Sequence, residues 1–259
     1  MSALLEVRDL EKRFGGVTAV TDVSFHVDRQ EIVALIGPNG AGKTTLFNMI
    51  SGVLIPTKGE IRLEGRSIIG RRPYELARLG LTRTFQNLQV FYRMTVLENV
   101  LVGYNVRMKS NMIAAGLALP TVRREENEAR ERALYWLGRF GLEKVAHVPA
   151  GTLSYGQLRL LEIARSAVAQ PQLMLLDEPM AGLNPKETQN LVEMMMTMRE
   201  EGMTFLFVEH DMQAVMHASD RIVVLDYGRM IAVGKPDEIA IHPEVIQAYL
   251  GQAYGQGQK

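Results

Sequence analysis

The sequence predicts an α/β protein in which a mixed sheet is interrupted by a mostly helical block. Three short apolar runs, at residues 31–36, 173–176 and 204–208, each end at polar residues suited to chemistry. Between them, from about residue 95 to residue 169, the pattern is mainly helical. Because parallel strands place ligands just beyond their carboxyl ends, we expect the residues that follow the three runs to converge on one crevice.

Apolar runs bounded by turn residues predict the individual strands. In chain order they are Leu4–Asp9, Val20–Val27, Glu31–Ile36, Gly59–Leu63, Leu173–Leu176, Thr204–Val208 and Ile222–Leu225. The last of these forms a predicted hairpin with residues 229–233 through Asp226-Tyr227-Gly228.

Helix signals lie between these strands. Pro73–Leu79 is a predicted short helix, and Thr95 with Glu98 has the spacing of a capping box. Residues 104–120 are predicted to be an irregular insert. An apolar stripe predicts a helix over Arg123–Phe140. The stripe is Ala129, Ala133, Trp136, Leu137 and Phe140. Met194, Met195, Met196 and Met198 lie at helical spacing with Leu191 and are predicted to pack in the core.

The composition limits the possible classes of protein. The 259 residues are 47% hydrophobic, enough for a sizeable core. Lys plus Arg and Asp plus Glu both number 29, so the basic stripe typical of a nucleic-acid binder is not expected. The chain has no Cys, no apolar run near 18 residues, and no basic region followed by an apolar one at its start. We therefore expect a soluble cytoplasmic protein.

The most specific motif follows the run at 31–36 and matches G-x-x-x-x-G-K-[ST]. It reads Gly37-Pro38-Asn39-Gly40-Ala41-Gly42-Lys43-Thr44, followed by Thr45. Glycines let the backbone wrap so that N–H groups form a nest for an anion, and the helix that begins near Thr44 adds its positive dipole end. Lys43 is expected to reach the β- and γ-phosphates of a nucleotide, and the Thr44 hydroxyl to hold Mg²⁺. The helix is predicted to end at Gly52.

Two carboxylates follow the run at 173–176. Asp177 is placed to hold Mg²⁺, directly or through water, and Glu178 to orient or deprotonate an attacking water. A turn or helix cap is the alternative for such a pair alone, and the phosphate loop favours the catalytic interpretation. Glu209 and His210 follow the run at 204–208 in the same way.

Leu153-Ser154-Tyr155-Gly156-Gln157 resembles the LSGGQ signature of ATP-binding cassette (ABC) ATPases. The order and spacing of GPNGAGKTT, Thr84-Phe85-Gln86-Asn87, LLDEP and the late His210 match that family over nearly the whole chain. The residue pattern itself supports this resemblance, because Ser154 and Gln157 have capping-box spacing and predict a helix through residues 158–169. A helix N-terminus beside a Gly is an anion site.

The resemblance implies a P-loop NTPase fold of the ABC nucleotide-binding type, with an N-terminal antiparallel β-subdomain and an inserted helical subdomain. Residues 1–259 would form one ATPase domain: 1–85 and 171–259 the RecA-like core plus β-subdomain, and 86–170 the helical, signature-bearing part. In this family two subunits meet head to tail and close two composite sites on two ATP molecules. Ser154, Gly156 and Gln157 would then contact the nucleotide held by the other subunit.

The resemblance also implies individual roles. Phe14 resembles the aromatic residue that stacks on adenine, with a plain core Phe as the alternative. Gln86 resembles the glutamine that touches Mg²⁺ and the attacking water, and His210 the histidine that senses the γ-phosphate. The catalytic set is therefore Glu178, His210, Gln86 and Lys43, and the Mg²⁺ ligands are Thr44, Gln86 and Asp177. ATP contacts are Phe14, residues 37–45 and the trans residues Ser154, Gly156 and Gln157.

Two positions depart from the family pattern. Tyr155 replaces a Gly of the signature, and Asn184 in Ala181-Gly182-Leu183-Asn184 replaces the usual Asp. We expect Tyr155 to be tolerated. Asn184 keeps an acceptor and loses a charge, so contacts across the dimer are expected to differ while hydrolysis survives.

Several stretches are most similar to the ATP-binding subunits of branched-chain amino acid importers, in particular the insert-bearing member of the pair. They are residues 81–91, 94–99, 104–120, 181–185 and 245–251. The resemblance implies a second ABC ATPase subunit (identical or not), two membrane-spanning permease subunits and a periplasmic or extracellular binding protein. The chain would work at the cytoplasmic face of the cell membrane.

Other functions stay open. Urea-type importers and the lipopolysaccharide-export ATPase share parts of this pattern. A different class is a non-transport ABC protein that acts on ribosomes or DNA. Such relatives usually carry two cassettes or a long coiled coil, and neither occurs here. A P-loop kinase or small GTPase is contradicted by the signature and Gln86.

Overall fold

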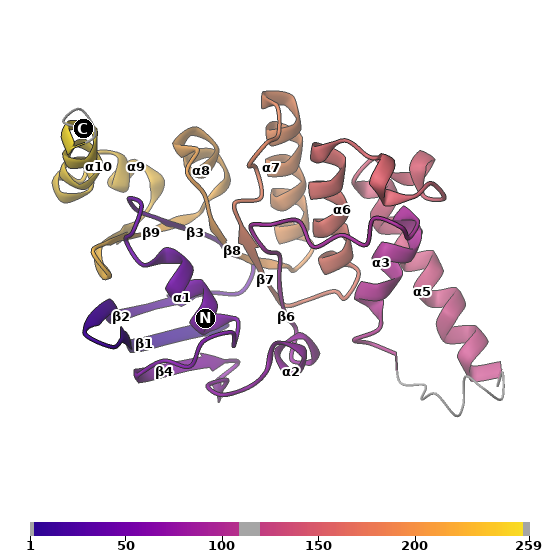
Figure 1. The fold of residues 1–259 in the computed structure, drawn as a ribbon, viewed down its shortest axis with the longest axis horizontal. Coiled ribbons are helices and arrows are strands. Elements are labelled where there is room, and N and C mark those ends of the chain that lie inside the picture. Colours follow the sequence, from indigo (N-terminus) through magenta and orange to yellow (C-terminus); the bar gives the residue numbers. More distant parts are fainter. Residues whose placement is uncertain (1–2, 109–119, 256–259) are drawn as a thin grey trace.

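The computed structural model describes residues 3–108 and 120–255, which contain two sheets and a set of helices around them (Figure 1). The smaller sheet is antiparallel and has the order β2-β1-β4-β5. Its strands are β1 (Leu5–Phe14), β2 (Val17–Val27), β4 (Lys58–Leu63) and β5 (Arg66–Ser67). An antiparallel N-terminal sheet is what the resemblance to the ABC ATPases implies.

The hairpin of β1 and β2 is longer at its tip than predicted. The predicted strands 4–9 and 20–27 omit residues 10–14 and 17–19, which pair across the turn at Gly15. The reason is local: Asp9 has a φ of 48°, and the register shifts between Val7 and Leu10. Such a bulge interrupts the alternation of apolar and polar residues on which strand prediction depends.

The larger sheet has six strands in the order β10-β9-β3-β8-β7-β6. They are β3 (Ile32–Ile36), β6 (Leu81–Arg83), β7 (Leu173–Asp177), β8 (Thr204–Val208), β9 (Arg221–Asp226) and β10 (Arg229–Gly234). All neighbours are parallel except the hairpin of β9 and β10. Since β3, β7 and β8 are parallel and adjacent or nearly so, their carboxyl ends lie at one edge, as predicted.

Residues of the central strands alternate between two buried cores, one on each face of the larger sheet. On one face, Val33 and Leu35 share a core with α1 (Lys43–Ile50) and the smaller sheet, so α1 lies between the two sheets (Figure 1). On the other face, Ile32 and Ala34 share a core with the helices that cover that face. Strands buried on both faces explain the continuous apolar runs of the sequence.

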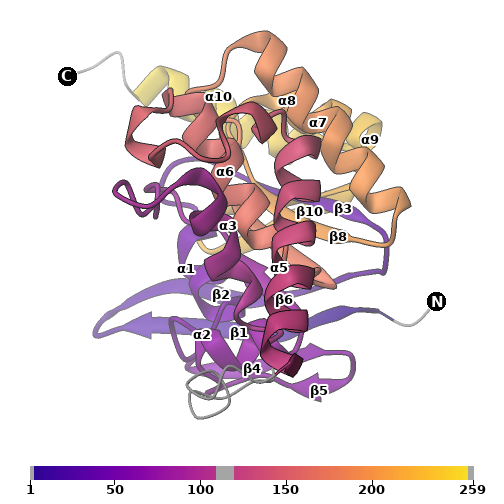
Figure 2. The same ribbon diagram turned by 90° about the vertical axis from the view of Figure 1, so that its right-hand side faces the viewer.

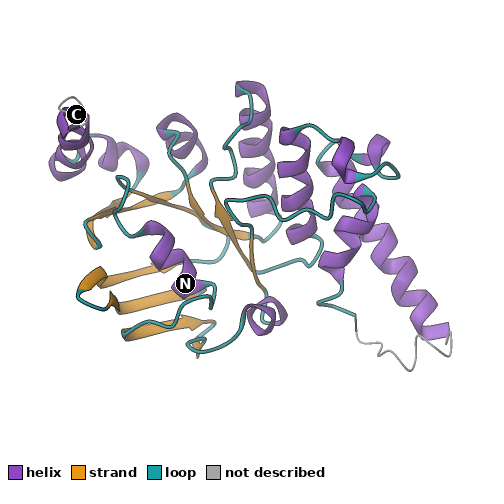
Figure 3. Ribbon diagram, viewed as in Figure 1, coloured by secondary structure: helices purple, strands orange, loops and turns teal. Residues whose placement is uncertain are grey.

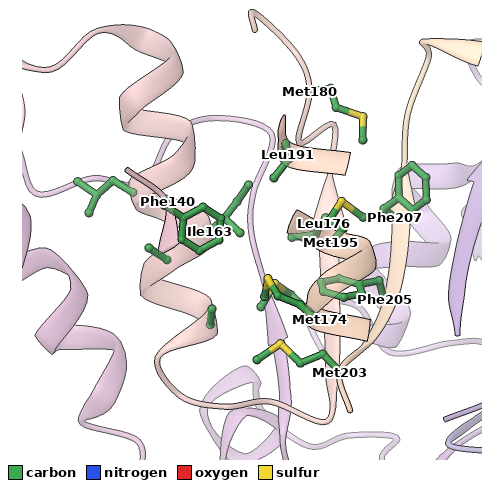
Figure 4. Close-up of a cluster of buried hydrophobic side chains, with 14 of the residues drawn as sticks. Phe140, Ile163, Met174, Leu176, Met180, Leu191, Met195, Met203, Phe205 and Phe207 are labelled. Carbon is green, nitrogen blue, oxygen red and sulfur yellow. The ribbon is translucent and has the colours of Figure 1, made fainter. Parts of the chain in front are cut away.

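The second core contains the predicted methionine cluster. Leu191, Met195 and Met198 of α7 (Pro185–Glu200) are buried, and Met194 and Met196 are half-buried against the same core. Figure 4 shows Met195 and Leu191 beside Met174, Phe205 and Phe207 of the sheet. The predicted core packing is confirmed, and flexible thioethers fill the space between a helix and the sheet.

The helices beyond α1 are α2 (Pro73–Arg78), α3 (Val96–Tyr104), α5 (Pro120–Arg139), α6 (Tyr155–Ala167), α7, α8 (Met212–Ala218), α9 (Pro236–Ala240) and α10 (Pro243–Gly255), with short 3₁₀ turns at Glu143–Val145 and Ala150–Thr152. Signals in the sequence predicted all of these helices except α8, α9 and α10. Thr95 caps α3 in a capping box with Glu98, and Gly52 ends α1 with a φ of 72°. The α5 stripe is buried.

α5 begins at Pro120 rather than at Arg123, because Pro is favoured in the first turn of a helix. Most of the predicted insert, residues 109–119, lies outside the described residues.

Helices α3, α5 and α6 pack against one another beyond the β6 edge of the larger sheet (Figures 1 and 2). The strands and helices coloured by type in Figure 3 show the same separation: both sheets on one side and this helical group on the other. The loop that carries Gln86 runs from β6 toward α3 and therefore joins the two parts.

Candidate nucleotide-binding and catalytic site

The phosphate loop connects β3 to α1 and is held by the β9–β10 hairpin. The amide of Gly228, in the hairpin turn, donates to the carbonyl of Ala41 at 3.0 Å. Gly37 has a φ of 149° and Gly42 a φ of 97°. A Cβ at Gly37 would lie 2.0 Å from the Leu225 carbonyl oxygen, and one at Gly42 2.6 Å from that of Ala19. Only glycine fits at these two positions, where other strands approach the loop.

Lys43 points into this loop. Its Nζ donates to the carbonyl oxygens of Gly37 at 2.6 Å and Pro38 at 2.9 Å, and the residue is only 6% exposed. Burial lowers the pKa of the Lys43 ammonium, and the negative charge of Glu178 opposes that shift. The loop thus holds a cation beneath a nest of backbone amides, which is the arrangement that favours a phosphate.

Glu178 connects the ends of three strands. Its Oε1 lies 3.0 Å from Nε2 of His210, and its Oε2 accepts from Nε2 of Gln86 at 3.3 Å. The Glu178 amide donates to the Val208 carbonyl at 2.9 Å, and its φ is 49°. A left-handed backbone is costly for a residue other than Gly and recurs at functional sites. The structure therefore brings together Gln86, Glu178 and His210, which the sequence placed far apart.

Asp177 is the last residue of β7 and is buried beside Arg83 of β6. Oδ2 of Asp177 accepts from Nη2 of Arg83 at 2.8 Å, and the two side chains are 8% and 6% exposed. The Asp177 amide donates to the Thr84 hydroxyl at 3.3 Å. Sequence reasoning missed Arg83, because nothing in the chain marks a partner 94 residues away.

Glu209 is a second residue that the prediction left without a role. Its Oε1 accepts from the Met180 amide at 2.7 Å, and its Oε2 accepts from the His210 amide at 2.9 Å. Burial raises the pKa of the Glu209 carboxyl, and these backbone donors oppose the shift. The sequence signal that could have revealed this role is a Glu at the end of an otherwise apolar run. The Glu209 carboxylate connects the segment after Glu178 to the backbone of His210.

The signature segment begins α6 as predicted. Ser154 caps the helix, and the Gln157 side chain accepts from the Ser154 amide at 3.1 Å, which completes the capping box. Ser154 is exposed, whereas Gly156 is buried, and a Cβ there would lie 2.9 Å from a Glu187 carboxylate oxygen. The neighbouring acidic group is a feature that the sequence pattern did not predict.

Tyr155 and Asn184 have structural roles here. A Cβ at Gly182 would lie 2.5 Å from Cε1 of Tyr155, so the ring packs directly on the loop after Glu178. Asn184 caps α7 by accepting from the amides of Lys186 and Glu187, both at 3.0 Å. Asn caps a helix as well as Asp does, so the N-terminus of α7 is stabilised even though Asn184 replaces the usual Asp.

Helix α6 holds the loop that carries Gln86. Arg159 donates to the carbonyl oxygens of Phe85 at 3.1 Å and Gln86 at 3.0 Å. It also pairs with Glu162 at 3.1 Å, and both side chains are 1% exposed. Burial raises the pKa of the Glu162 carboxyl, and Arg159 opposes that shift. A paired charge in the interior fixes this loop to the signature helix.

Phe14 ends β1 and is 46% exposed, with Nζ of Lys12 5.2 Å from the centre of its ring. This exposure contradicts the alternative of a plain core Phe. An aromatic face open to solvent is able to stack on a planar ligand, and the adenine contact stays a prediction.

The residues predicted to hold Mg²⁺ offer oxygen atoms only: a Thr44 hydroxyl, a Gln86 amide oxygen and the Asp177 carboxylate. Hard oxygen ligands suit Mg²⁺, which binds few protein groups and completes its shell with water and phosphate oxygens. Residues 3–108 and 120–255 contain no cluster of three His, Cys, Asp or Glu side chains able to hold a metal. This donor set fits a metal that binds together with a nucleotide rather than one held by protein side chains alone.

A glycine loop between a buried parallel strand and a helix, with carboxylates at the ends of neighbouring strands, defines a P-loop nucleoside triphosphatase. The ABC transporter family model matches residues 20–181, and the branched-chain amino acid ATP-binding cassette transporter model matches residues 229–255. The chain belongs to the ABC transporter family, as an ATP-binding subunit that hydrolyses ATP.

Curated relatives are similar over almost their whole length. The high-affinity branched-chain amino acid transport ATP-binding protein BraF of Pseudomonas aeruginosa is 47% identical over 96% of this chain and 98% of its own. LivG of Escherichia coli K12, which carries the same description, is also 47% identical, with the same two coverages.

Solved structures share the fold. An ATP-binding cassette of an ABC transporter in its ADP conformation superposes with a TM-score of 0.84, at 32% identity over 97% of this chain and 100% of the other. A dimeric post-hydrolysis cassette bound to ADP and Pi gives a TM-score of 0.76, at 25% identity over 90% of this chain and 98% of that one. Among the described residues, no helix is both long enough and apolar enough to cross a membrane.

Proposed function

We propose that this chain hydrolyses ATP with Glu178 as the base and with Gln86, His210 and Lys43 as its catalytic partners. The observation that carries the proposal is the position of Glu178, held between Gln86 and His210 at 3.3 and 3.0 Å. A carboxylate fixed on both oxygens at the carboxyl edge of the sheet is able to orient a water toward a phosphate in the neighbouring loop.

Hydrolysis transfers the γ-phosphoryl group of ATP to water. The water oxygen forms a bond to the γ-phosphorus, and its proton passes to Glu178. The bond between the γ-phosphorus and the β–γ bridging oxygen breaks, and its electron pair leaves with ADP. Lys43 would lie under the phosphates and His210 beside the γ-phosphate, and both would offset negative charge that builds on the transferred group.

The nucleotide site is assigned to residues 37–45 and Phe14, and the Mg²⁺ site to Thr44, Gln86 and Asp177. Bound Mg²⁺ would neutralise charge on the β- and γ-phosphate oxygens. Phe14 would stack on adenine, since its ring is exposed at the end of β1.

We assign the other half of the pocket to a second ABC ATPase subunit. The chain has one phosphate loop and one signature. Ser154 is exposed at the N-terminus of α6, where the helix dipole favours an anion. Ser154, Gly156 and Gln157 would reach the γ-phosphate bound by the other subunit. The dimeric state named for one similar cassette supports this arrangement.

The transported substrate is assigned to branched-chain amino acids, because the 47% identical relatives are named for that transport. The partners would then be two membrane-spanning permease subunits and a binding protein outside the membrane, with this chain bound peripherally at the cytoplasmic face.

A groove of about 350 Å³ between the helical group and the sheets supports a permease contact. Apolar and cationic residues line it, among them Val53, Phe85, Val102 and Arg165. A short helix of a permease subunit is the occupant that we assign, since Phe85 directly precedes Gln86 and so joins the groove to the catalytic loop.

Two experiments test the proposal. Glu178→Gln should bind ATP, hydrolyse it very slowly and accumulate as a dimer in size-exclusion chromatography, alone or with its permease. The double variant Glu178→Gln/Lys43→Ala should stay monomeric. A Glu178→Gln variant that stays monomeric with ATP, with and without the permease, would contradict the composite site.

The substrate is tested in membrane vesicles that contain the purified complex. ATP-dependent uptake of leucine, isoleucine and valine is the expected result. Uptake of urea, or release of lipopolysaccharide, would favour the alternative transporters. Co-purification of ribosomes or DNA in place of membrane subunits would overturn the transport function.

A further inference from the structure

Arg83 is held by hydrogen bonds to two different elements, helix α1 and strand β7. Its Nη1 donates to Oδ1 of Asn48 at 2.7 Å and to the Ser51 hydroxyl at 2.6 Å, both at the end of α1. Its Nη2 donates to Asp177 Oδ2 at 2.8 Å. The guanidinium is thus a rigid fork between the helix that follows the phosphate loop and the strand that ends in Asp177.

Two aromatic rings lie close to the same guanidinium group. The Arg83 guanidinium carbon lies 5.6 Å from the centre of the Phe47 ring and 4.9 Å from that of Phe85. With its side chain 6% exposed, Arg83 has little freedom to turn. Its Nε is buried without a hydrogen-bond partner within the described part of the chain. A buried polar atom left unpaired is costly, so the other contacts of the guanidinium must offset this cost.

The contact fixes one oxygen of Asp177. Among the described residues, Arg83 is the side chain that bonds this carboxylate, and it uses Oδ2. Carboxylates that bind metals are themselves hydrogen-bonded, and the groups behind them set the direction of the remaining oxygen. Arg83 is therefore suited to fix the orientation of the Asp177 carboxylate and to leave Oδ1 for another ligand.

We infer that Arg83 is the positioning residue of the magnesium site: it orients Asp177 toward the metal and ties that aspartate to α1. This inference rests on the proposed function, in which Asp177 binds Mg²⁺. Arg83 also lines the groove assigned to the permease, beside Phe85. A segment bound in that groove therefore lies one side chain away from the magnesium ligand.

The test compares variants of the full chain in two assays. The first is the Mg²⁺ concentration that half-activates ATP hydrolysis at saturating ATP. The second is the affinity for the fluorescent nucleotide mant-ATP, measured in EDTA and in Mg²⁺. For Arg83→Met, we expect the half-activating Mg²⁺ concentration to rise about 10- to 100-fold, the range for groups behind a metal ligand. Affinity in EDTA should stay within about twofold, and the gain in affinity from Mg²⁺ should shrink.

Arg139→Met is the matched control. Arg139, the last residue of α5, also lies over an aromatic ring, with its guanidinium carbon 5.4 Å from the centre of the Trp136 ring. It pairs with the carboxylate of Glu201 and not with Asp177. Its Mg²⁺ dependence should equal that of the wild type. Arg83→Lys keeps a cation without the planar fork, so its half-activating Mg²⁺ concentration should lie between those of the wild type and Arg83→Met. If Arg83→Met fails to fold, Arg83→Lys takes its place in the test.

Asp177→Asn separates failure of this inference from failure of the proposed site. If Asp177→Asn loses the Mg²⁺ dependence and both Arg83 variants keep it, Arg83 does not position the aspartate, and the inference is overturned. If Asp177→Asn also keeps wild-type Mg²⁺ dependence, the assignment of Asp177 to Mg²⁺ fails. In the double variant, Arg83→Met should add nothing to Asp177→Asn, because both act through one carboxylate.

Discussion

Glu178 Oε1 and His210 Nε2 lie 3.0 Å apart, although the two residues follow different strands and are 32 positions apart in the chain. The contact depends on the parallel pairing of β7 and β8, which sets Asp177 opposite Val208. The left-handed backbone of Glu178 then directs its side chain toward His210 and Gln86. The geometry of the sheet therefore builds the catalytic pair.

Removing the histidine should affect turnover and spare binding. For His210→Ala, we expect kcat to fall about 100-fold or more, since Glu178 loses one of the two groups that hold it. The Kd for mant-ATP should change little, because His210 is 47% exposed and lies outside the phosphate loop. The measurement is steady-state ATPase together with nucleotide titration. His217→Ala, an exposed histidine of α8, is the control and should behave as wild type; a normal kcat in His210→Ala would contradict the assignment.

Lys43→Ala should instead weaken nucleotide binding. The ammonium is buried beneath the loop and bonded to two of its carbonyl groups, so its loss removes both the charge under the phosphates and two supports of the loop. A hydrogen bond to a charged group contributes about 1.5–3 kcal/mol, so the Kd for ATP should rise about 10-fold or more. Lys58→Ala, at a side chain that is 67% exposed, provides the comparison. Unchanged ATP affinity in Lys43→Ala would remove the phosphate-loop assignment.

Local patterns predicted the parts of this site that depend on neighbours in sequence. The glycine loop, the Ser154 capping box and the acidic strand ends each have a signal within a few residues, and the structure contains all of them. Strand β6 was missed because its three residues pair only with β7. The contact of Arg83 with Asp177 was missed for a different reason: it joins residues 94 positions apart and exists only once β6 and β7 are paired.

Tyr155 and Gly182 should be coupled energetically. Gly182 has a φ of 76°, so Ala there carries a backbone cost of about 1–2 kcal/mol in any background. In the wild type the new methyl would also meet the Tyr155 ring, at 2.5 Å from Cε1. Gly182→Ala should therefore destabilise the wild type more than it destabilises Tyr155→Ala, with a coupling of about 0.5–3 kcal/mol. Urea denaturation of the four proteins measures it, and additive effects would show that the ring does not press on this loop.

Glu209 should give the chain a specific dependence of stability on pH. Burial raises the pKa of its carboxyl above the ordinary value of 4.5, so the folded chain retains a proton that the unfolded chain releases. Between about pH 4.5 and the folded pKa the folded state binds more protons at this site, so the contribution of Glu209 to the free energy of unfolding falls as pH rises through this range. Above the folded pKa, the cost of burying the ionised carboxylate is constant.

Glu209→Gln isolates that contribution. The amide keeps one acceptor for the Met180 or the His210 amide and cannot ionise. The stability of the wild type relative to Glu209→Gln should therefore be greatest below about pH 4.5 and decline toward neutral pH. Urea denaturation at closely spaced pH values measures the difference. Glu200→Gln, which replaces a side chain that is 71% exposed, is the control. If the stability difference between the wild type and Glu209→Gln does not change between about pH 4.5 and neutral pH, the backbone donors around this carboxylate fully offset its burial.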